Sequence, residues 1–154
     1  MASRRKGRIL AFQALYSWEA NKVPVTELTD FSWLEPEKRQ ALENGTSEFS
    51  RLLFMGTVEN ITAIDKKIQD HLKNWDFSRL NRVDLAILRL STYTLIFQND
   101  VSPSIVIDEA IGIAREFGTT DSFRFINGVL DSIRKTLRDE SDQQKTVNES
   151  TLLS

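Results

Sequence analysis

The stretch LNRVDLAILRLSTYTLIF at residues 80–97 decides the fold that the sequence predicts, because almost all of it can be buried. Its apolar side chains recur three and four residues apart, which is the spacing of a helix face. They are Leu80, Val83, Ala86, Ile87, Leu90, Tyr93, Leu95 and Phe97. A helix that is apolar nearly all round needs neighbours on several sides. The stretch therefore predicts the central helix of an all-α bundle.

The segments on either side show the same helical period. We expect one or two short helices within residues 25–45, and longer ones at residues 8–18, 46–72, 103–117 and from 119–122 to about 138. No strand period, repeat or linker interrupts them. The predicted fold class is therefore all-α, a single domain of about six or seven helices at residues 4–138. Residues 139–154 are too polar to bury and are expected to form a frayed or disordered tail.

Polar residues and glycines mark the expected helix ends and contacts. The residues expected at helix starts are Thr46 or Ser47, Asp76 or Ser78, and Ser102 before Pro103. Gly118 follows the last apolar residue of its segment, where helices commonly end. Gly112 and Gly128 lie inside predicted helices, so we expect a close backbone contact at each.

The composition excludes several kinds of chemistry. The 154 residues contain no cysteine, which removes thiol nucleophiles and cysteine zinc sites, and one histidine, His71, in a stretch typical of solvated helix. The candidate carboxylate pairs, Asp108 with Glu109 and Glu59 with Asp65, are interpreted as solvated helix faces. We therefore expect no metal, no cofactor and no enzymatic activity. Without a membrane-length apolar run or a signal peptide, a cytoplasmic location is expected.

Charge is distributed unevenly along the chain. The net charge is −2, but residues 1–8 carry four basic side chains and no acid, whereas residues 9–131 carry a net charge of −6. The basic residues are Arg4, Arg5, Lys6 and Arg8. Cations at a helix start are mildly unfavourable unless they serve a purpose, and phosphate binding is one, because helix-start amides and guanidinium groups both bind phosphate.

A second candidate surface lies at the start of the last core helix. Phe125 is in phase with the apolar face there, which leaves Phe123 and Arg124 facing outward. Aromatic and arginine planes beside a helix start are typical of sites that stack unpaired RNA bases.

Four blocks of residues, in this order, carry a resemblance to a known family. They are RRKGRILAFQALYSW at residues 4–18, VDLAILRL at 83–90, IVIDEAIGIAREFG at 105–118 and DSFRFINGVLD at 121–131. Together they resemble the NusB family of bacterial transcription antitermination factors. The resemblance implies two small helical subdomains and binding of the boxA element of ribosomal RNA leader transcripts together with NusE, a small-subunit ribosomal protein. The complex would join RNA polymerase and other Nus factors to promote complete transcription of ribosomal RNA operons.

The resemblance also implies site residues. The arginine-rich RNA-binding motif falls on Arg4, Arg5, Lys6 and Arg8, and a second RNA-contacting region on Asp121, Ser122, Arg124 and Phe125. To these the residue types add Phe123 and Asn127, which would bear on base identity. The surface for NusE falls on Tyr16 and on Asp84, which stands where the family has a glutamate. Tyr16 and Phe125 also lie near apolar stripes, so each is either a contact or a core residue.

Two other function classes stay open at this point. A standalone RNA-binding module would bind boxA RNA equally well with and without NusE. A helical adaptor for proteins alone would keep its function when Arg4, Arg5 and Arg8 are neutralised. The apolar face of the first helix suits either a partner or a second copy of the chain, so a homodimer is possible as well as a monomer.

Overall fold

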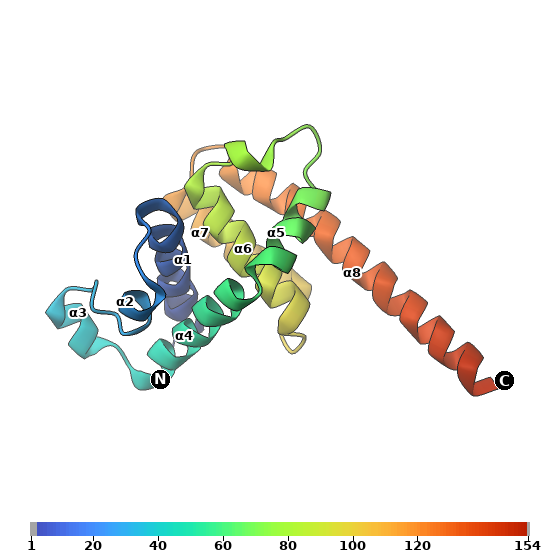
Figure 1. The fold of residues 1–154 in the computed structure, drawn as a ribbon, viewed down its shortest axis with the longest axis horizontal. Helices are drawn as coiled ribbons and strands as arrows, with labels where there is room; N and C mark the ends of the chain where they lie inside the picture. Colours follow the sequence, from blue (N-terminus) through green and yellow to red (C-terminus); the bar gives the residue numbers. More distant parts are fainter. Residues whose placement is uncertain (1–2, 154) are drawn as a thin grey trace.

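A computed structural model describes the backbone of residues 3–153 and the side chains of residues 3–149 (Figure 1). This part of the chain contains helices and no strand, which confirms the all-α prediction. The helices are α1 (Arg4–Asn21), α2 (Val25–Thr29), α3 (Pro36–Ala41), α4 (Asn44–Glu59), α5 (Ile61–Asp70), the 3-10 helix η1 (Phe77–Arg79), α6 (Arg82–Phe97), α7 (Pro103–Phe117) and α8 (Ser122–Leu153). None of them has the length and apolar content needed to cross a bilayer.

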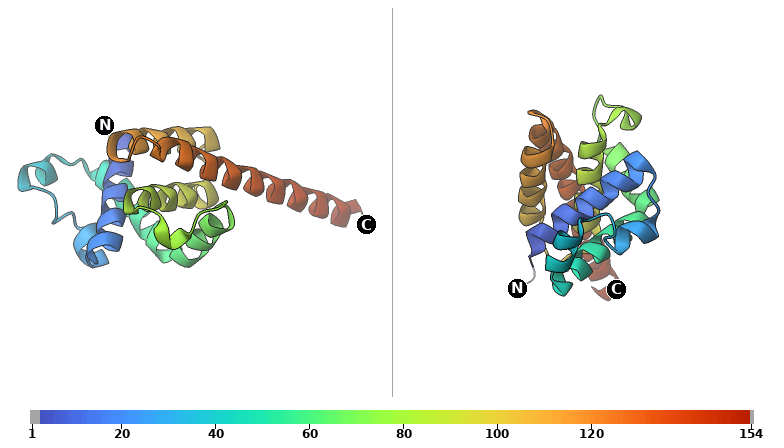
Figure 2. Two further views of the ribbon diagram at one scale, coloured as in Figure 1. Left: turned by 90° about the horizontal axis from the view of Figure 1, so that it is seen from above. Right: turned by 90° about the vertical axis from the view of Figure 1, so that its left-hand side faces the viewer.

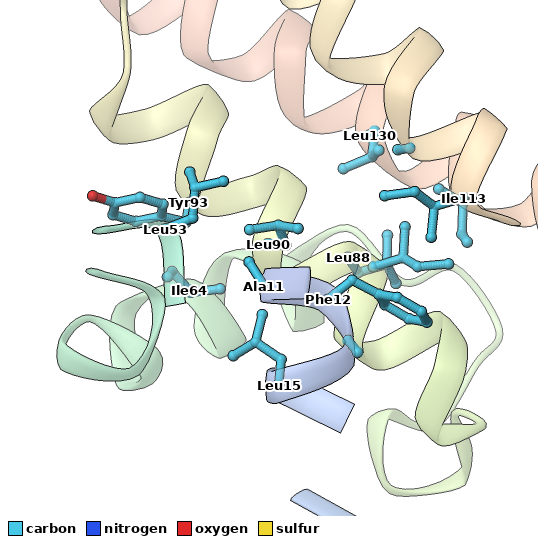
Figure 3. Close-up of a cluster of buried hydrophobic side chains, with 14 of the residues drawn as sticks. Ala11, Phe12, Leu15, Leu53, Ile64, Leu88, Leu90, Tyr93, Ile113 and Leu130 are labelled. Atoms are coloured by element: carbon cyan, nitrogen blue, oxygen red, sulfur yellow. The ribbon is translucent and has the colours of Figure 1, made fainter. Parts of the chain in front are cut away.

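Helix α6 is the centre of the bundle, as its sequence predicts. It packs against α1, α4 and α5 and also against α7 and α8. In the left view of Figure 2, α6 lies between the α7–α8 pair and the α4–α5 pair, while α1 crosses one end. Every residue of α6 from Asp84 to Thr94 is buried. The core around it draws on both groups of helices, including Leu15 and Leu53 on one side and Ile113 and Leu130 on the other (Figure 3).

The ends of α7 confirm two sequence predictions, whereas the start of α6 differs. The backbone N–H of Ile105 donates to the Ser102 hydroxyl across 3.4 Å, and Gly118 is the C-terminal cap. Helix α6 is capped by Asn81, whose side-chain oxygen accepts from the N–H of Asp84 at 2.8 Å. Asp76, one of the expected caps of this helix, instead caps η1.

The single helix expected at residues 46–72 is two helices, α4 and α5. The side chain of Asn60 donates to the Gly56 carbonyl oxygen at 2.8 Å, so it occupies a backbone acceptor of the preceding turn. Such a local bond competes with helix continuation, and α5 restarts at Ile61. This break and the two short helices bring the number of α-helices in the described part to eight, above the predicted six or seven.

The last helix runs further than the sequence predicts. Helix α8 continues to Leu153, through the segment that is expected to be frayed or disordered. All described side chains from residue 139 to 149 are exposed, and Figure 1 shows this half of α8 projecting away from the bundle. One contact near its base ties it to the body: Lys67 Nζ lies 3.4 Å from Glu140 Oε1. From there to residue 149 the described side chains of the helix add nothing to the core.

Candidate nucleic-acid interface

The backbone at the start of α1 is held by hydrogen bonds on both sides. The Lys6 N–H donates to the Ser3 hydroxyl at 3.2 Å, which caps the helix. The Ser3 N–H in turn donates to the hydroxyl of Thr46 at 2.9 Å. Thr46, an expected helix cap, is therefore buried for a different reason: it anchors the chain that leads into the basic residues.

The ring of Phe49 in α4 packs against two of the basic side chains of α1. A Cβ atom on Gly7 would lie 2.7 Å from the Phe49 ring, so only glycine allows α1 to approach α4 this closely. The Arg4 guanidinium lies 4.2 Å from the ring centroid of Phe49, and that of Arg8 lies 5.6 Å from it. This arrangement orients two of the four predicted phosphate-binding side chains.

The four basic residues differ in how available they are. Arg4, Arg5 and Lys6 are exposed at the first turn of α1. The Arg8 side chain is only 14% exposed, and its guanidinium lies 3.8 Å from the Glu109 carboxylate of α7. Arg8 is thus partly neutralised within the protein, whereas the other three cations face solvent.

The second predicted region is at the start of α8, and one of its members is not at the surface. Ser122 is 1% exposed, and its hydroxyl accepts from the Thr119 N–H at 3.0 Å. The side chain closes the turn between α7 and α8, and its contact with RNA stays a prediction. Asp121, Arg124 and Asn127 are exposed. Asp121 directly precedes α8 and its carbonyl oxygen accepts from the Phe125 N–H at 3.3 Å, but its carboxylate makes no capping hydrogen bond to any described residue.

The two phenylalanines of this region are both half-buried and both packed against the core. Two arginines lie close to the ring of Phe123, with the guanidinium of Arg115 4.9 Å and that of Arg124 5.5 Å from its centroid. Phe125 contacts the ring of Trp75 at a centroid distance of 5.3 Å. Phe125 was expected to be either an RNA contact or a core residue. In the structure one part of its ring packs on the core, and the rest is exposed at the surface.

Arg115 of α7 connects the two predicted regions, and the sequence analysis missed it. The Arg5 Nη2 atom lies 3.7 Å from the place where a Gly112 Cβ would be. Arg115 is one helical turn beyond Gly112, on the same face, and stacks on Phe123. The exposed cations thus continue from α1 across α7 to α8. The close backbone contact expected at Gly112 is absent among the described residues, where only this flexible arginine approaches.

The predicted partner-binding residues lie beside a cleft of about 400 Å³. Its lining includes Tyr16, Phe117 and residues 81–83. Asp84 is the next residue of α6 after this lining segment. Asn81 Nδ2 donates to Asp84 Oδ2 at 3.0 Å. Oδ1 of the same carboxylate is buried without a hydrogen-bond partner in the described part of the chain. A buried carboxylate oxygen without a hydrogen-bond partner has lost its hydration, which costs stability.

A buried ionic cluster fixes the other half of α1 and was not foreseen from the sequence. Arg89 of α6 is 5% exposed and binds Asp65 of α5 through two hydrogen bonds of 2.9 Å. Its Nη1 also lies 3.2 Å from Glu19 of α1. Burial acts to lower the pKa of Arg89, but the bonds to Asp65 and Glu19 outweigh it and raise that pKa. Arg89 therefore stays charged and ties three helices together.

Comparisons with known proteins agree with this arrangement. A model of the NusB family matches residues 5–135. A transcription antitermination protein NusB from Treponema pallidum (strain Nichols) is 54% identical over 136 residues, covering 86% of this chain and 93% of that protein. One from Treponema denticola is 53% identical over 131 residues, covering 85% and 95%.

Solved structures give the same result. NusB from T. maritima superposes with a TM-score of 0.76 at 34% identity, covering 88% of this chain and 93% of that one. A complex described as antitermination factors NusB and NusE with dsRNA superposes with a TM-score of 0.77 at 28% identity, covering 86% and 96%. The family match covers the second candidate region, the central helix and all of the first candidate region except Arg4, and this chain belongs to the NusB family.

Proposed function

We propose that this chain is a non-enzymatic transcription antitermination factor that acts in the cytoplasm. It binds boxA RNA jointly with NusE and, through that complex, joins RNA polymerase and other Nus factors. The observation that carries the proposal is the exposed cationic and aromatic path from Arg5 over Arg115 to Phe123 and Arg124. NusB relatives named as antitermination proteins, and a related NusB–NusE–dsRNA complex, support it.

The path divides RNA binding into two contributions. Exposed Arg4, Arg5 and Lys6 provide charge-assisted contacts to phosphates, which give affinity that falls as salt rises. The surface around Phe123 and Asn127 offers stacking and hydrogen bonding to unpaired bases, which carry sequence information. Because Arg8 is paired with Glu109, its share of the phosphate contacts is smaller than that of the other three.

The partner contact uses the opposite sign of charge. Residues 9–131 carry a net charge of −6, which attracts a basic ribosomal protein. Tyr16 and the other residues that line its cleft offer the contact surface for that partner, with the buried Asp84 next to Val83 of the lining. The partner then adds its own cations beside the RNA path, so RNA and NusE bind cooperatively.

Fluorescence anisotropy of a labelled boxA RNA tests this function directly. The wild-type chain is titrated with and without purified NusE, against a scrambled RNA, over a series of salt concentrations. About four phosphate contacts predict a log–log slope near −3, at about −0.7 for each contact on single strands. Selective binding that NusE tightens is the expected result. Binding indifferent to sequence and to NusE would contradict the proposal and favour a generic RNA-binding module.

A further inference from the structure

Trp75 is unusually exposed for a tryptophan. At 59% relative exposure it is the most exposed of the large hydrophobic side chains in the described part of the chain. It lies between α5 and η1, in the segment of residues 71–76 that leads to the central helix. A single exposed apolar residue is common on protein surfaces, so exposure alone carries no argument. The surroundings of Trp75 do carry one.

The Trp75 ring is held in place against α8. It packs on Phe125 with a centroid distance of 5.3 Å and an interplanar angle of 56°, and Phe125 itself packs on the core. A second contact ties the same segment to α8, because Nδ1 of His71 lies 2.8 Å from the Ser132 hydroxyl. Figure 1 shows this connection running beside the first turns of α8. The exposed indole is therefore oriented before any ligand arrives.

Gly128 lies on the same face of α8, between these two contacts. It is three residues after Phe125 and four before Ser132, a spacing that puts all three residues on one side of the helix. Gly128 is exposed, and no atom within 4 Å would meet a Cβ there apart from the chain next to it and the backbone of its own helix. Glycine inside a helix costs stability, and no packing within the described residues explains it. The close approach of a ligand to the backbone of α8 would explain a glycine at this position.

We propose that Trp75 and Phe125 form a stacking site for an unpaired RNA base, and that Gly128 leaves room for the nucleotide beside it. The site rests on the proposed function: Phe125 already belongs to the predicted RNA-contacting region, and Trp75 and Gly128 are the residues that the site adds to it. A nucleobase has an apolar face and a polar edge, and this surface matches both. The aromatic pair supplies the face, while the exposed side chains of Asp121, Arg124 and Asn127 supply charge, acceptors and donors for the edge.

The polarity around Trp75 favours RNA over a protein ligand. Its sequence neighbours Lys73, Asn74 and Asp76 are all exposed and polar. The centre of a protein interface gathers several apolar side chains, whereas Trp75 is the one exposed large hydrophobic residue within residues 71–76. Stacking of a base needs only the ring face, which tolerates a wet surrounding.

The test compares Trp75→Ala with wild type in anisotropy titrations of single-stranded boxA RNA, without NusE, over a salt series. Loss of one stacked base lowers affinity by roughly 5- to 100-fold. The slope of log affinity against log salt stays unchanged, since no phosphate contact is removed. Trp75→Phe retains most of the affinity. Phe97→Ala is the matched control, because Phe97 is also an exposed aromatic packed on another ring, that of Tyr93, and should leave binding unchanged.

Gly128→Ala gives a second reading that unfolding cannot mimic. The added methyl group favours the helix, so the Tm rises by about 1–4 °C. It also occupies the space beside the base, so RNA binding weakens. A variant that is more stable and binds less supports the site.

Three results would overturn the site. If Trp75→Ala binds RNA like wild type, the site fails while the proposed function stands. If Trp75→Ala keeps RNA binding but loses NusE, the aromatic pair belongs to a protein interface. If wild type itself binds no single-stranded RNA, the proposed function fails and the site with it.

Discussion

The guanidinium group of Arg4 lies 4.2 Å above the ring of Phe49, a residue of a different helix. We expect Phe49→Leu to lower RNA affinity about two- to fivefold, because a cation–π contact at an exposed site contributes about 0.5–1 kcal/mol. All charges remain, so the salt slope does not change. Anisotropy titrations measure this, and thermal unfolding checks that the fold persists. An unaltered affinity would show that Arg4 needs no support from Phe49.

Neutralising single cations on the path should change the salt dependence instead. Arg5→Ala and Arg115→Ala are each expected to weaken binding and to reduce the magnitude of the salt slope by about 0.7. Arg51→Ala is the control, because Arg51 also lies over an aromatic ring, that of Phe31, but outside the path. If Arg115→Ala leaves the slope of log affinity against log salt unchanged, Arg115 makes no phosphate contact and does not link the two RNA-contacting regions.

Asp65→Ala should be strongly destabilising. It removes two hydrogen bonds from the buried guanidinium of Arg89 and leaves Glu19 as its remaining carboxylate partner. We expect a loss of about 3 kcal/mol, the lower end of the range for a broken buried pair. Urea denaturation measures it. Asp70→Ala breaks only the exposed pair with Lys66 and should cost under about 1 kcal/mol. If both variants lose a similar free energy of unfolding, the buried pair of Asp65 and Arg89 is no more important for stability than the exposed pair of Asp70 and Lys66.

Two glycines inside helices should respond to alanine with opposite signs. A Cβ at Gly56 would lie 2.3 Å from the hydroxyl and Cζ of Tyr93, so Gly56→Ala forces α4 and α6 apart and costs about 1–3 kcal/mol. Gly128→Ala meets no such obstacle and should gain about 0.5–1 kcal/mol. Denaturant unfolding of the two variants in parallel gives both values. Equal signs would contradict the packing described for Gly56.

The single histidine should make stability depend on pH. Burial, followed by the nearby charge of Lys67, lowers the pKa of His71 from its usual 6.5. The folded protein therefore favours the neutral ring, and the unfolded chain binds the proton more readily. The free energy of unfolding is highest above pH 6.5 and falls as the pH drops through the pKa of the folded state.

NMR titration of the His71 ring measures this pKa, and denaturation between about pH 7 and pH 5 measures the linked loss of stability. His71→Gln should remove this component of the pH dependence. A pKa at or above 6.5 in the folded protein would contradict the prediction.

The sequence is sufficient to predict the fold class because the pattern of α6 allows few alternatives. A segment as apolar as residues 83–90 has to be surrounded, and the flanking segments supply amphipathic helices for that purpose. The break at Asn60 was not predictable in the same way. Ile61 and Ile64 continue the apolar period across it, and the bond from Asn60 to the Gly56 carbonyl oxygen depends on local geometry that periodicity does not report.

The two regions of the candidate site can be predicted from the sequence, but the residues that join them in space cannot. The basic run at residues 4–8 and the segment at 121–127 are visible as residue types. Arg115 reads as an ordinary solvated arginine until α7 is seen to lie between the two regions. A serine at a helix start suits a ligand and a turn equally well, and only the structure shows that the Ser122 hydroxyl is buried and bonded within the turn. Trp75 becomes informative only through its contact with Phe125.

One helix, α1, carries both the exposed arginines and the buried side chains of Leu10 and Leu15. Its backbone is therefore ordered when the core forms, and RNA meets a surface that needs little further ordering. Arginine-rich segments that fold only on binding bury additional apolar surface at that moment, which appears as a large negative heat-capacity change. For this protein, calorimetry of RNA binding should give a heat-capacity change that is small, with the loss of conformational entropy already incurred during folding.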